Sequence, residues 1–93
     1  MSFDVKYHEH VIRNNIPKIS HEMRNRIKDA IEKKLMAHPE IFGKPLRRSL
    51  KNYWKLRVGE WRIIYRIEKE TVKIFIIDHR SAVYEKVPRR IFT

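Results

Sequence analysis

The sequence predicts an α+β fold, in the order β-α-α-β-β-β, in which a helical hairpin covers one face of a small antiparallel sheet. Two kinds of hydrophobic spacing support this prediction. Apolar residues alternate with polar ones in short runs, which is the period of a half-buried strand. Elsewhere they recur every three or four residues, which is the period of an amphipathic helix. The chain has 93 residues, enough for one hydrophobic core, and we expect a single domain over residues 1–93.

The first half of the chain begins with one strand and one weak helix. Ser2–Tyr7 predicts a half-buried strand, because its apolar side chains alternate with Asp4 and Lys6. His8–Ile16 has weak helical spacing. We expect Pro17 to end or bend this helix, because proline lacks a backbone N–H and fixes its own φ angle.

A stronger helix is predicted from Ser20 to His38. The Ser20 hydroxyl can cap its first turn, and Pro39 disfavours a helical conformation for the residue before it. The stripe expected to pack inward consists of Met23, Ile27, Ala30, Ile31 and Leu35. Residues 39–52 are predicted to be a loop that its apolar residues hold to the body, namely Ile41, Phe42, Leu46 and Leu50.

Three more strands are predicted at Trp54–Val58, Trp61–Ile67 and Val72–Ile77, the first two joined by the turn Gly59-Glu60. In the first of them, Lys55 and Arg57 alternate with apolar residues and so share one face. The second repeats the division, with Arg62 and Arg66 opposite its apolar face. The third is apolar on both faces except for Lys73, which is typical of a strand covered on both sides.

The charge of the chain indicates an anionic partner. Its 22 Lys and Arg against 11 Asp and Glu give a formal net charge of +11. Residues 1–45 carry 9 basic and 6 acidic side chains, whereas residues 46–93 carry 13 basic and 5 acidic ones. A basic surface that only keeps the protein soluble is the simpler alternative. A nucleic acid or a strongly acidic protein fits this magnitude and asymmetry better.

Several classes of function are disfavoured by composition. The chain has no cysteine, which rules out disulfides and thiolate metal sites and fits the cytosol. No segment resembles a signal peptide or reaches the roughly 18 apolar residues of a membrane span, so we expect a soluble, cytoplasmic protein. His8 and His10 suggest metal ligands, but the other histidines complete no plausible set, so neither a metal nor another cofactor is expected.

The candidate site combines basic residues with one aromatic residue: Lys55, Arg57, Arg62, Arg80 and Tyr84, with His79 beside them. RNA can be cleaved without a metal when its 2′-hydroxyl attacks the adjacent phosphorus. That reaction needs a proton acceptor, cations for the non-bridging oxygens and a proton donor for the leaving 5′-oxygen. Guanidinium and ammonium groups suit the phosphate, and an aromatic ring can stack an unpaired base.

Simpler interpretations of the same residues stay open. Lys55 and Arg57 could form a solvated strand face, and Arg62 and Arg80 could be charge-paired at the sheet edge. His79 is the ordinary side chain best suited to accept a proton near neutral pH, but it could equally bind Asp78 or a backbone carbonyl.

Two sequence blocks resemble the RelE/ParE superfamily of bacterial toxin–antitoxin toxins. The first is K-L-R-V-G-x-x-R-I-I-Y at Lys55–Tyr65, and the second is H-R-x-x-V-Y at His79–Tyr84. With the order of the elements, the resemblance covers nearly the whole chain. It implies a RelE-like fold. Members with different targets share the first block, whereas the second says more about activity.

For function, the resemblance implies the toxin of a type II system. Such a toxin would be an mRNA interferase, an endoribonuclease that enters the ribosomal A site and cuts the codon there without a metal, leaving a cyclic phosphate. Lys55 and Arg57 fall on the paired basic positions of the first block, and Arg62 falls on its phosphate-holding arginine. In the second block, Arg80 falls on the arginine of the last strand and Tyr84 on the tyrosine that stacks or orients the base.

One departure from the family pattern concerns the general base. The second basic position can be a lysine that serves as this base, but here it is Arg57, and arginine stays protonated in proteins. The resemblance therefore assigns Arg57, Arg62 and Arg80 to charge stabilisation. His79 or Lys55 is left as the proton carrier.

The resemblance also implies partners and an alternative. The partners are the ribosome with its mRNA and a small acidic antitoxin that wraps the toxin and blocks it. The alternative is a ParE-like toxin that is not a nuclease and inhibits DNA gyrase. A nucleic-acid-binding module without catalysis is a third possibility that the charge alone supports.

Overall fold

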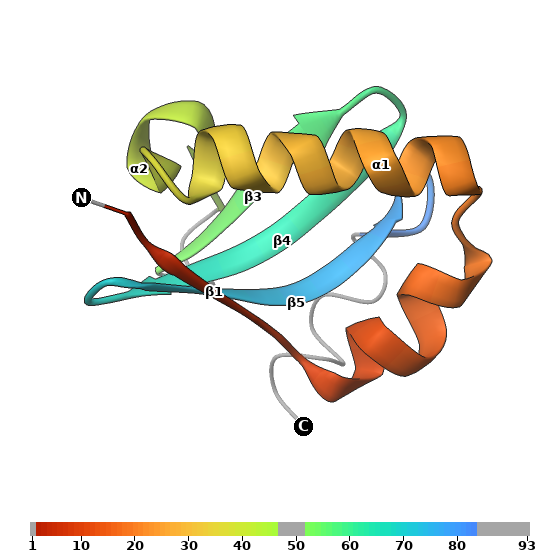
Figure 1. Ribbon diagram of the computed structural model, residues 1–93, viewed down its shortest axis with the longest axis horizontal. Helices are drawn as coiled ribbons and strands as arrows, with labels where there is room; N and C mark the ends of the chain where they lie inside the picture. The colour runs from red at the N-terminus through yellow and green to blue at the C-terminus, as the bar shows by residue number, and fades with distance from the viewer. Residues whose placement is uncertain (1, 47–51, 84–93) are drawn as a thin grey trace.

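A computed structural model describes residues 2–46 and 52–83 of the chain (Figure 1). Its elements in chain order are β1 (Asp4–Tyr7), the π-helical turn η1 (Val11–Asn15), the 3₁₀ turn η2 (Ile16–Lys18), α1 (His21–Ala30), its π-helical extension η3 (Ile31–Leu35), α2 (Pro39–Phe42), β2 (Lys44–Pro45), β3 (Tyr53–Val58), β4 (Trp61–Glu68) and β5 (Thr71–His79). The α+β class is confirmed. None of the helices in the described ranges is long and apolar enough to span a membrane.

The sheet has five strands in the order β1-β5-β4-β3-β2. β3, β4 and β5 are joined by tight turns and pair antiparallel, as predicted, but β1 lies parallel to β5. The prediction of a wholly antiparallel sheet was therefore wrong. Alternation of apolar residues identifies a strand and its faces but carries no information on its direction. The helical segments lead the chain from the end of β1 back across the sheet to β3 (Figure 1).

The predicted long helix lies across one face of the sheet (Figure 1). The Ser20 hydroxyl accepts a hydrogen bond from the backbone N–H of Met23 at 3.3 Å, which confirms the predicted N-cap. Ile27, Ile31 and Leu35 are buried in the core beneath it. The weaker helical segment forms η1 and η2 instead of one regular helix, and Pro17 lies in the first turn of η2.

The sheet is covered by apolar side chains on both faces. The larger cluster lies between the helices and the sheet and includes Leu56, Ile63, Tyr65, Val72, Ile74 and Ile77. A smaller cluster of Ile64, Ile76 and Val83 lies on the opposite face, with Leu46, Tyr53 and Phe75 against it. The prediction that the last strand is covered on both sides is confirmed.

A β-bulge interrupts the pairing of β4 with β5. Tyr65 pairs with Ile74 and Ile64 pairs with Ile76, so Phe75 is the extra residue. The bulge reverses the alternation of faces along β5. Ile74 and Ile77 therefore both reach the helix-side core, although they are three residues apart.

The segment predicted as a loop contains α2 and β2. The preceding helix ends at Leu35, before the predicted end at His38, and Pro39 begins α2, because proline fits the first turn of a helix. Ile41 and Phe42 are 67% and 47% exposed, so the prediction that they hold the segment to the body was wrong for these two. Leu46 packs against the smaller cluster, and Leu50 lies outside the described residues.

Tyr65 holds this segment to the sheet. Its hydroxyl donates a buried hydrogen bond of 2.6 Å to the carbonyl of Pro39. Gly43 approaches the same ring so closely that any Cβ at this position would collide with the Tyr65 Oη. Burial, followed by the charge of Glu40, raises the pKa of the Tyr65 phenol, so the hydroxyl remains a proton donor at neutral pH.

We predict that Tyr65→Phe lowers the free energy of unfolding by about 0.5–1.5 kcal/mol, because the buried Pro39 carbonyl loses its shorter hydrogen bond and keeps only that from the Gly43 N–H at 3.3 Å. Urea denaturation followed by circular dichroism measures this change. Tyr53→Phe is the matched control. Its ring packs against Phe75, and the same loss of a hydroxyl should change the free energy by about 0.5 kcal/mol or less. Equal effects of the two substitutions would contradict the role given to the Tyr65 hydroxyl.

Candidate phosphate-binding site

The β3–β4 hairpin and β2 bring four cations to one face of the sheet. Lys55 and Arg57 alternate on β3 with the buried Leu56 and Val58, so they point away from the helix-side core. Arg62 is the β4 partner of Arg57, and Lys44 is the β2 partner of Lys55. Gly59, at φ +59°, supplies the left-handed conformation that the tight β3–β4 turn needs.

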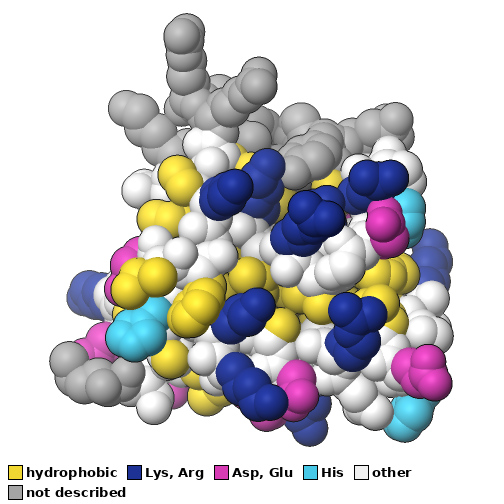
Figure 2. All heavy atoms as spheres, turned by 90° about the horizontal axis from the view of Figure 1, so that it is seen from above, with side chains coloured by type: hydrophobic (Ala, Val, Ile, Leu, Met, Phe, Trp, Pro, Cys, Tyr) yellow, Lys and Arg dark blue, Asp and Glu magenta, His cyan; other side chains and the backbone are white. Residues whose placement is uncertain are grey.

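These cations line a cavity of about 220 Å³ together with Phe42. We call this cavity, formed by Phe42, Lys44, Lys55, Arg57 and Arg62, the cationic pocket. Lys and Arg side chains are also spread across the side of the molecule seen in Figure 2, with few acidic side chains between them. Like charges directly opposite each other on neighbouring strands destabilise a sheet, and the pocket contains two such pairs. A bound polyanion would relieve both repulsions.

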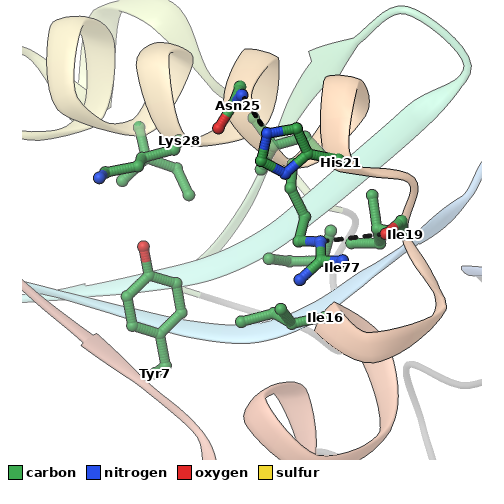
Figure 3. Close-up of a pocket in the computed structure, with 10 residues that line it drawn as sticks. Tyr7, Ile16, Ile19, His21, Asn25, Lys28 and Ile77 are labelled. Atoms are coloured by element: carbon green, nitrogen blue, oxygen red, sulfur yellow. Dashed lines mark hydrogen bonds between the residues drawn. The ribbon is translucent and has the colours of Figure 1, made fainter.

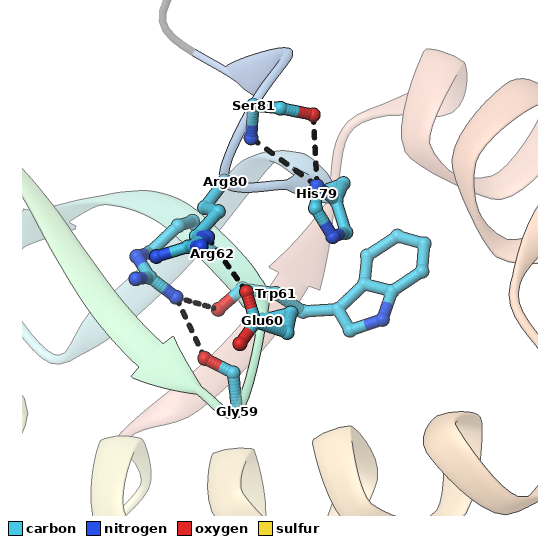
Figure 4. Close-up of polar contacts among 7 residues, drawn as sticks. All are labelled: Gly59, Glu60, Trp61, Arg62, His79, Arg80 and Ser81. Carbon is cyan, nitrogen blue, oxygen red and sulfur yellow. Dashed lines mark hydrogen bonds and ion pairs between the residues drawn. The ribbon is translucent and has the colours of Figure 1, made fainter.

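Arg62 is oriented by the turn beside it (Figure 4). Its Nη1 donates to the carbonyl oxygens of Gly59 and Trp61, both at 2.9 Å, and these bonds fix the plane of the guanidinium. Asp78, its partner on β5, adds a carboxylate to this face of the sheet. Charge pairing was the simpler interpretation of Arg62. In the structure, two backbone carbonyls hold its guanidinium in place.

Arg80 is engaged with the same turn. Its Nε lies 2.6 Å from Glu60 Oε2, and its backbone N–H donates to the Glu60 carbonyl at 2.8 Å. The two side chains are 61% and 59% exposed, so their ion pair contributes little to stability. The simpler interpretation, that Arg80 is charge-paired at the edge of the sheet, therefore describes its position here, with Glu60 as its partner.

The structure separates His79 from the cationic pocket. His79 pairs with Trp61, and their rings meet edge to face with centroids 6.1 Å apart (Figure 4). Trp61 packs against the helix-side core, and directly paired residues point to the same face, so His79 lies opposite Arg62. Uninterrupted alternation from Val72 would have placed His79 with the cations. The bulge at Phe75 reverses that phase.

The imidazole of His79 has its own partners. Its Nδ1 lies 2.8 Å from Ser81 Oγ and accepts the backbone N–H of Ser81 at 3.2 Å. A neutral ring with Nδ1 as acceptor carries its proton on Nε2. The lone pair of Nδ1 is therefore already directed at Ser81, which disfavours His79 as a proton acceptor for a substrate.

Two residues of the pocket were missed by sequence reasoning, and one predicted residue cannot be placed. Lys44 and Phe42 fall in the segment predicted as a loop, and only the pairing of β2 with β3 brings them to the site. Lys44 stands between Gly43 and Pro45, so local pattern gave no signal for it. Tyr84 lies outside the described residues.

A second cavity, of about 310 Å³, lies between α1, η2 and the β1–β5 edge (Figure 3). Ile16, Ile19 and Ile77 contribute to its apolar lining. At its rim, Arg24 Nε donates to the Ile19 carbonyl at 3.1 Å and Asn25 lies within 3.4 Å of the His21 ring nitrogen. Its lining includes Arg24 and Lys28 but no like-charged pair on neighbouring strands, which is the feature that makes the cationic pocket suited to phosphate. Among residues 2–46 and 52–83, no three His, Asp or Glu side chains are grouped to hold a metal.

Comparisons with known proteins agree on the family of this chain. The family model described as the ParE toxin of the type II toxin–antitoxin system parDE matches residues 5–84. Toxin RelG of Mycobacterium tuberculosis is 43% identical over 54 residues, which cover 56% of this chain and 62% of RelG. Toxin RelE of the same organism is 38% identical over 58 residues, 60% of each chain. The matches thus span about three fifths of the length of these relatives.

Solved structures share the fold. A chain of the toxin–antitoxin complex RelBE2 from Mycobacterium tuberculosis superposes with a TM-score of 0.78 at 30% identity, over 87% of this chain and 94% of that one. A mutant of the E. coli toxin RelE in the free state has a TM-score of 0.76 at 18% identity, over 98% and 99% of the two chains. The chain belongs to the ParE-toxin family of type II toxin–antitoxin systems, within the RelE/ParE superfamily.

Proposed function

We propose that this protein is the toxin of a type II system and acts in the cytoplasm as a ribosome-dependent mRNA interferase. The observation that supports this most strongly is the cationic pocket, with its two like-charged cross-strand pairs. Arg57 opposite Arg62 is a like-charge pair that destabilises the sheet, and an anion between the two side chains would relieve the repulsion. A phosphodiester of single-stranded RNA has the charge and size for this position.

The proposed reaction is internal transfer at phosphorus. The 2′-oxygen of the codon attacks the adjacent phosphorus and loses its proton to a base, while the bond from phosphorus to the 5′-oxygen breaks. A proton donor then protonates the leaving oxygen, which gives a 2′,3′-cyclic phosphate and a 5′-hydroxyl. Arg57 and Arg62 stabilise the negative charge that grows on the non-bridging oxygens, and the carbonyl bonds of Arg62 hold it ready before the substrate binds.

Lys55 is the proposed proton carrier. It lines the cationic pocket beside Arg57, whereas His79 lies on the opposite face of the sheet with Nδ1 directed at Ser81. Arg57 is unsuited to the role because a guanidinium does not release its proton under ordinary conditions. Arg80 and Tyr84 remain proposed contributors, with Arg80 held near the β3–β4 turn by Glu60.

An acidic antitoxin is the proposed regulatory partner. The RelBE2 structure and that of RelB–RelE from Methanococcus jannaschii are both toxin–antitoxin complexes. The net charge of +11 suits a small acidic chain that covers the cationic face, with association that is fast and weakened by salt.

Inhibition of DNA gyrase without nuclease activity is the second candidate function. The family model that matches this chain is described as a ParE toxin, which is compatible with this alternative. An inhibitor that binds protein has no need of paired arginines that line one cavity, so the cationic pocket favours the nuclease.

We predict that Arg57→Gln and Arg62→Gln each lower the single-turnover rate of mRNA cleavage by about 10²–10³-fold, because each removes a donor to the transition-state charge. Cleavage would be followed by primer extension on a defined message in a purified translation system. Arg13→Gln is the matched control. It removes the same charge from η1, where Arg13 pairs with Glu9 at 2.7 Å, and should leave the rate within about threefold.

Arg57→Gln should also keep or gain stability, by about 0.2–1 kcal/mol, because it relieves a like-charge pair. Arg62→Gln loses the two carbonyl bonds as well, so its stability should change less favourably. Loss of cleavage together with loss of folding would contradict the assignment. If the wild-type toxin leaves translated messages intact and gyrase-dependent DNA breaks appear in cells, the nuclease proposal fails and the alternative holds.

A further prediction separates the two candidate proton carriers. We expect Lys55→Arg to lower the cleavage rate at least about 100-fold, since it keeps the charge but not the ability to give up a proton. His79→Gln should leave the rate within about threefold, because its side chain lies across the sheet from the cationic pocket. A larger loss of rate in His79→Gln than in Lys55→Arg would identify His79 as the proton carrier.

A further inference from the structure

We propose that Phe42 is a base-stacking platform at the cationic pocket, which holds an unpaired nucleobase beside the phosphate bound by Arg57 and Arg62. This inference rests on the proposed function and adds a residue that positions the substrate. Phe42 is 47% exposed and lines the same cavity as the four cations. Single exposed apolar side chains are common on protein surfaces, so the position of Phe42, more than its exposure, supports the assignment.

The backbone that carries Phe42 is anchored on both sides. Before it, the Pro39 carbonyl accepts the buried hydrogen bond of Tyr65, and after it, Gly43 lies against the Tyr65 ring. The backbone N–H of Phe42 also donates to the His38 carbonyl at 3.2 Å. α2 is therefore fixed to the sheet that carries the cations. An aromatic ring on such a support loses little conformational freedom when a base stacks on it.

One cation lies over the ring and others line the same cavity. Lys34 Nζ lies over it, 5.8 Å from the ring centroid, and Lys44 and Lys55 share the pocket. An aromatic surface within a cationic groove is the combination that binds single-stranded nucleic acid, because the base stacks while the backbone is neutralised. The base next to the scissile phosphate is the group that this arrangement would hold.

An apolar protein interface fits this surface less well than RNA does. Such interfaces place their exposed aromatic residues in a desolvated centre from which Lys, Asp and Glu are depleted. The residues that line the cavity with Phe42 are Lys44, Lys55, Arg57 and Arg62, all of them charged. Ile41, the other exposed apolar residue of α2, lies outside this lining.

The test measures single-turnover cleavage on purified bacterial ribosomes programmed with a defined message and an empty A site. Phe42→Leu keeps the apolar volume but removes the aromatic face, and Phe42→Tyr restores that face. We expect Phe42→Leu to raise the toxin concentration for half-maximal rate by roughly 5- to 100-fold, and Phe42→Tyr to remain within about threefold of wild type. Ile41→Ala, on the same turn of helix and outside the cavity, is the control and should match wild type.

A second substrate identifies the stacked base. Messages with one abasic nucleotide, at each position of the A-site codon in turn, are compared for the wild type and Phe42→Leu. At the stacked position, loss of the base should cost the wild type about the same factor as Phe42→Leu does. It should then cost Phe42→Leu little more, because the two changes remove one interaction.

The outcomes separate this inference from the function on which it rests. Cleavage by the wild type with no defect in Phe42→Leu overturns the stacking role and leaves the nuclease standing. A defect in Phe42→Leu that adds to every abasic change also overturns it, and points to a contact with protein or ribosome. If the wild type leaves the intact message uncut, both the proposed function and this inference fail.

Discussion

The pairing of Arg57 with Arg62 across the β3–β4 hairpin is the constraint around which the site is built. Directly paired residues share a face, so the same register that buries Leu56 against Ile63 brings the two guanidinium groups together on the other side. The repulsion is tolerated because apolar packing beneath the hairpin fixes the register. A slip by one residue would expose the core. The core therefore sets the charge density of the site, and a bound phosphate would lower its electrostatic cost.

Tyr65 links the helix-side core to the segment that carries Phe42 and Lys44 to the cationic pocket. Its ring belongs to the helix-side core, while its hydroxyl binds Pro39 and its ring edge leaves room only for glycine at position 43. This contact sets where α2 ends and β2 begins, and β2 places Lys44 beside Lys55. One buried side chain thus positions Phe42 and Lys44 at the cationic pocket, although neither belongs to the hairpin that supplies Lys55, Arg57 and Arg62. The same residue therefore links the packing of the core to the geometry of the cationic pocket.

Local sequence pattern was sufficient for features that depend on near neighbours. The Ser20 cap, the inward stripe of the long helix and the faces of β3 and β4 followed from spacing, because each depends on residues within one or two turns. Features that depend on distant partners were missed. The direction of β1 and the pairing of β2 with β3 involve residues far apart in sequence. The face on which His79 lies could not be predicted either, because the extra residue Phe75 reverses the faces of β5, and hydrophobicity does not reveal a bulge within an apolar run.

In the proposed mechanism, the phosphate in the cationic pocket is attacked by the neighbouring 2′-hydroxyl. The most direct test uses a message with a single 2′-deoxynucleotide at the mapped cleavage position, translated beside the all-ribose message with the wild-type toxin. We expect the all-ribose message to yield a 2′,3′-cyclic phosphate and a 5′-hydroxyl, and the substituted message to stay intact at that position. Cleavage of the 2′-deoxy message at the same phosphate, or a 5′-phosphate on the downstream fragment, would contradict it.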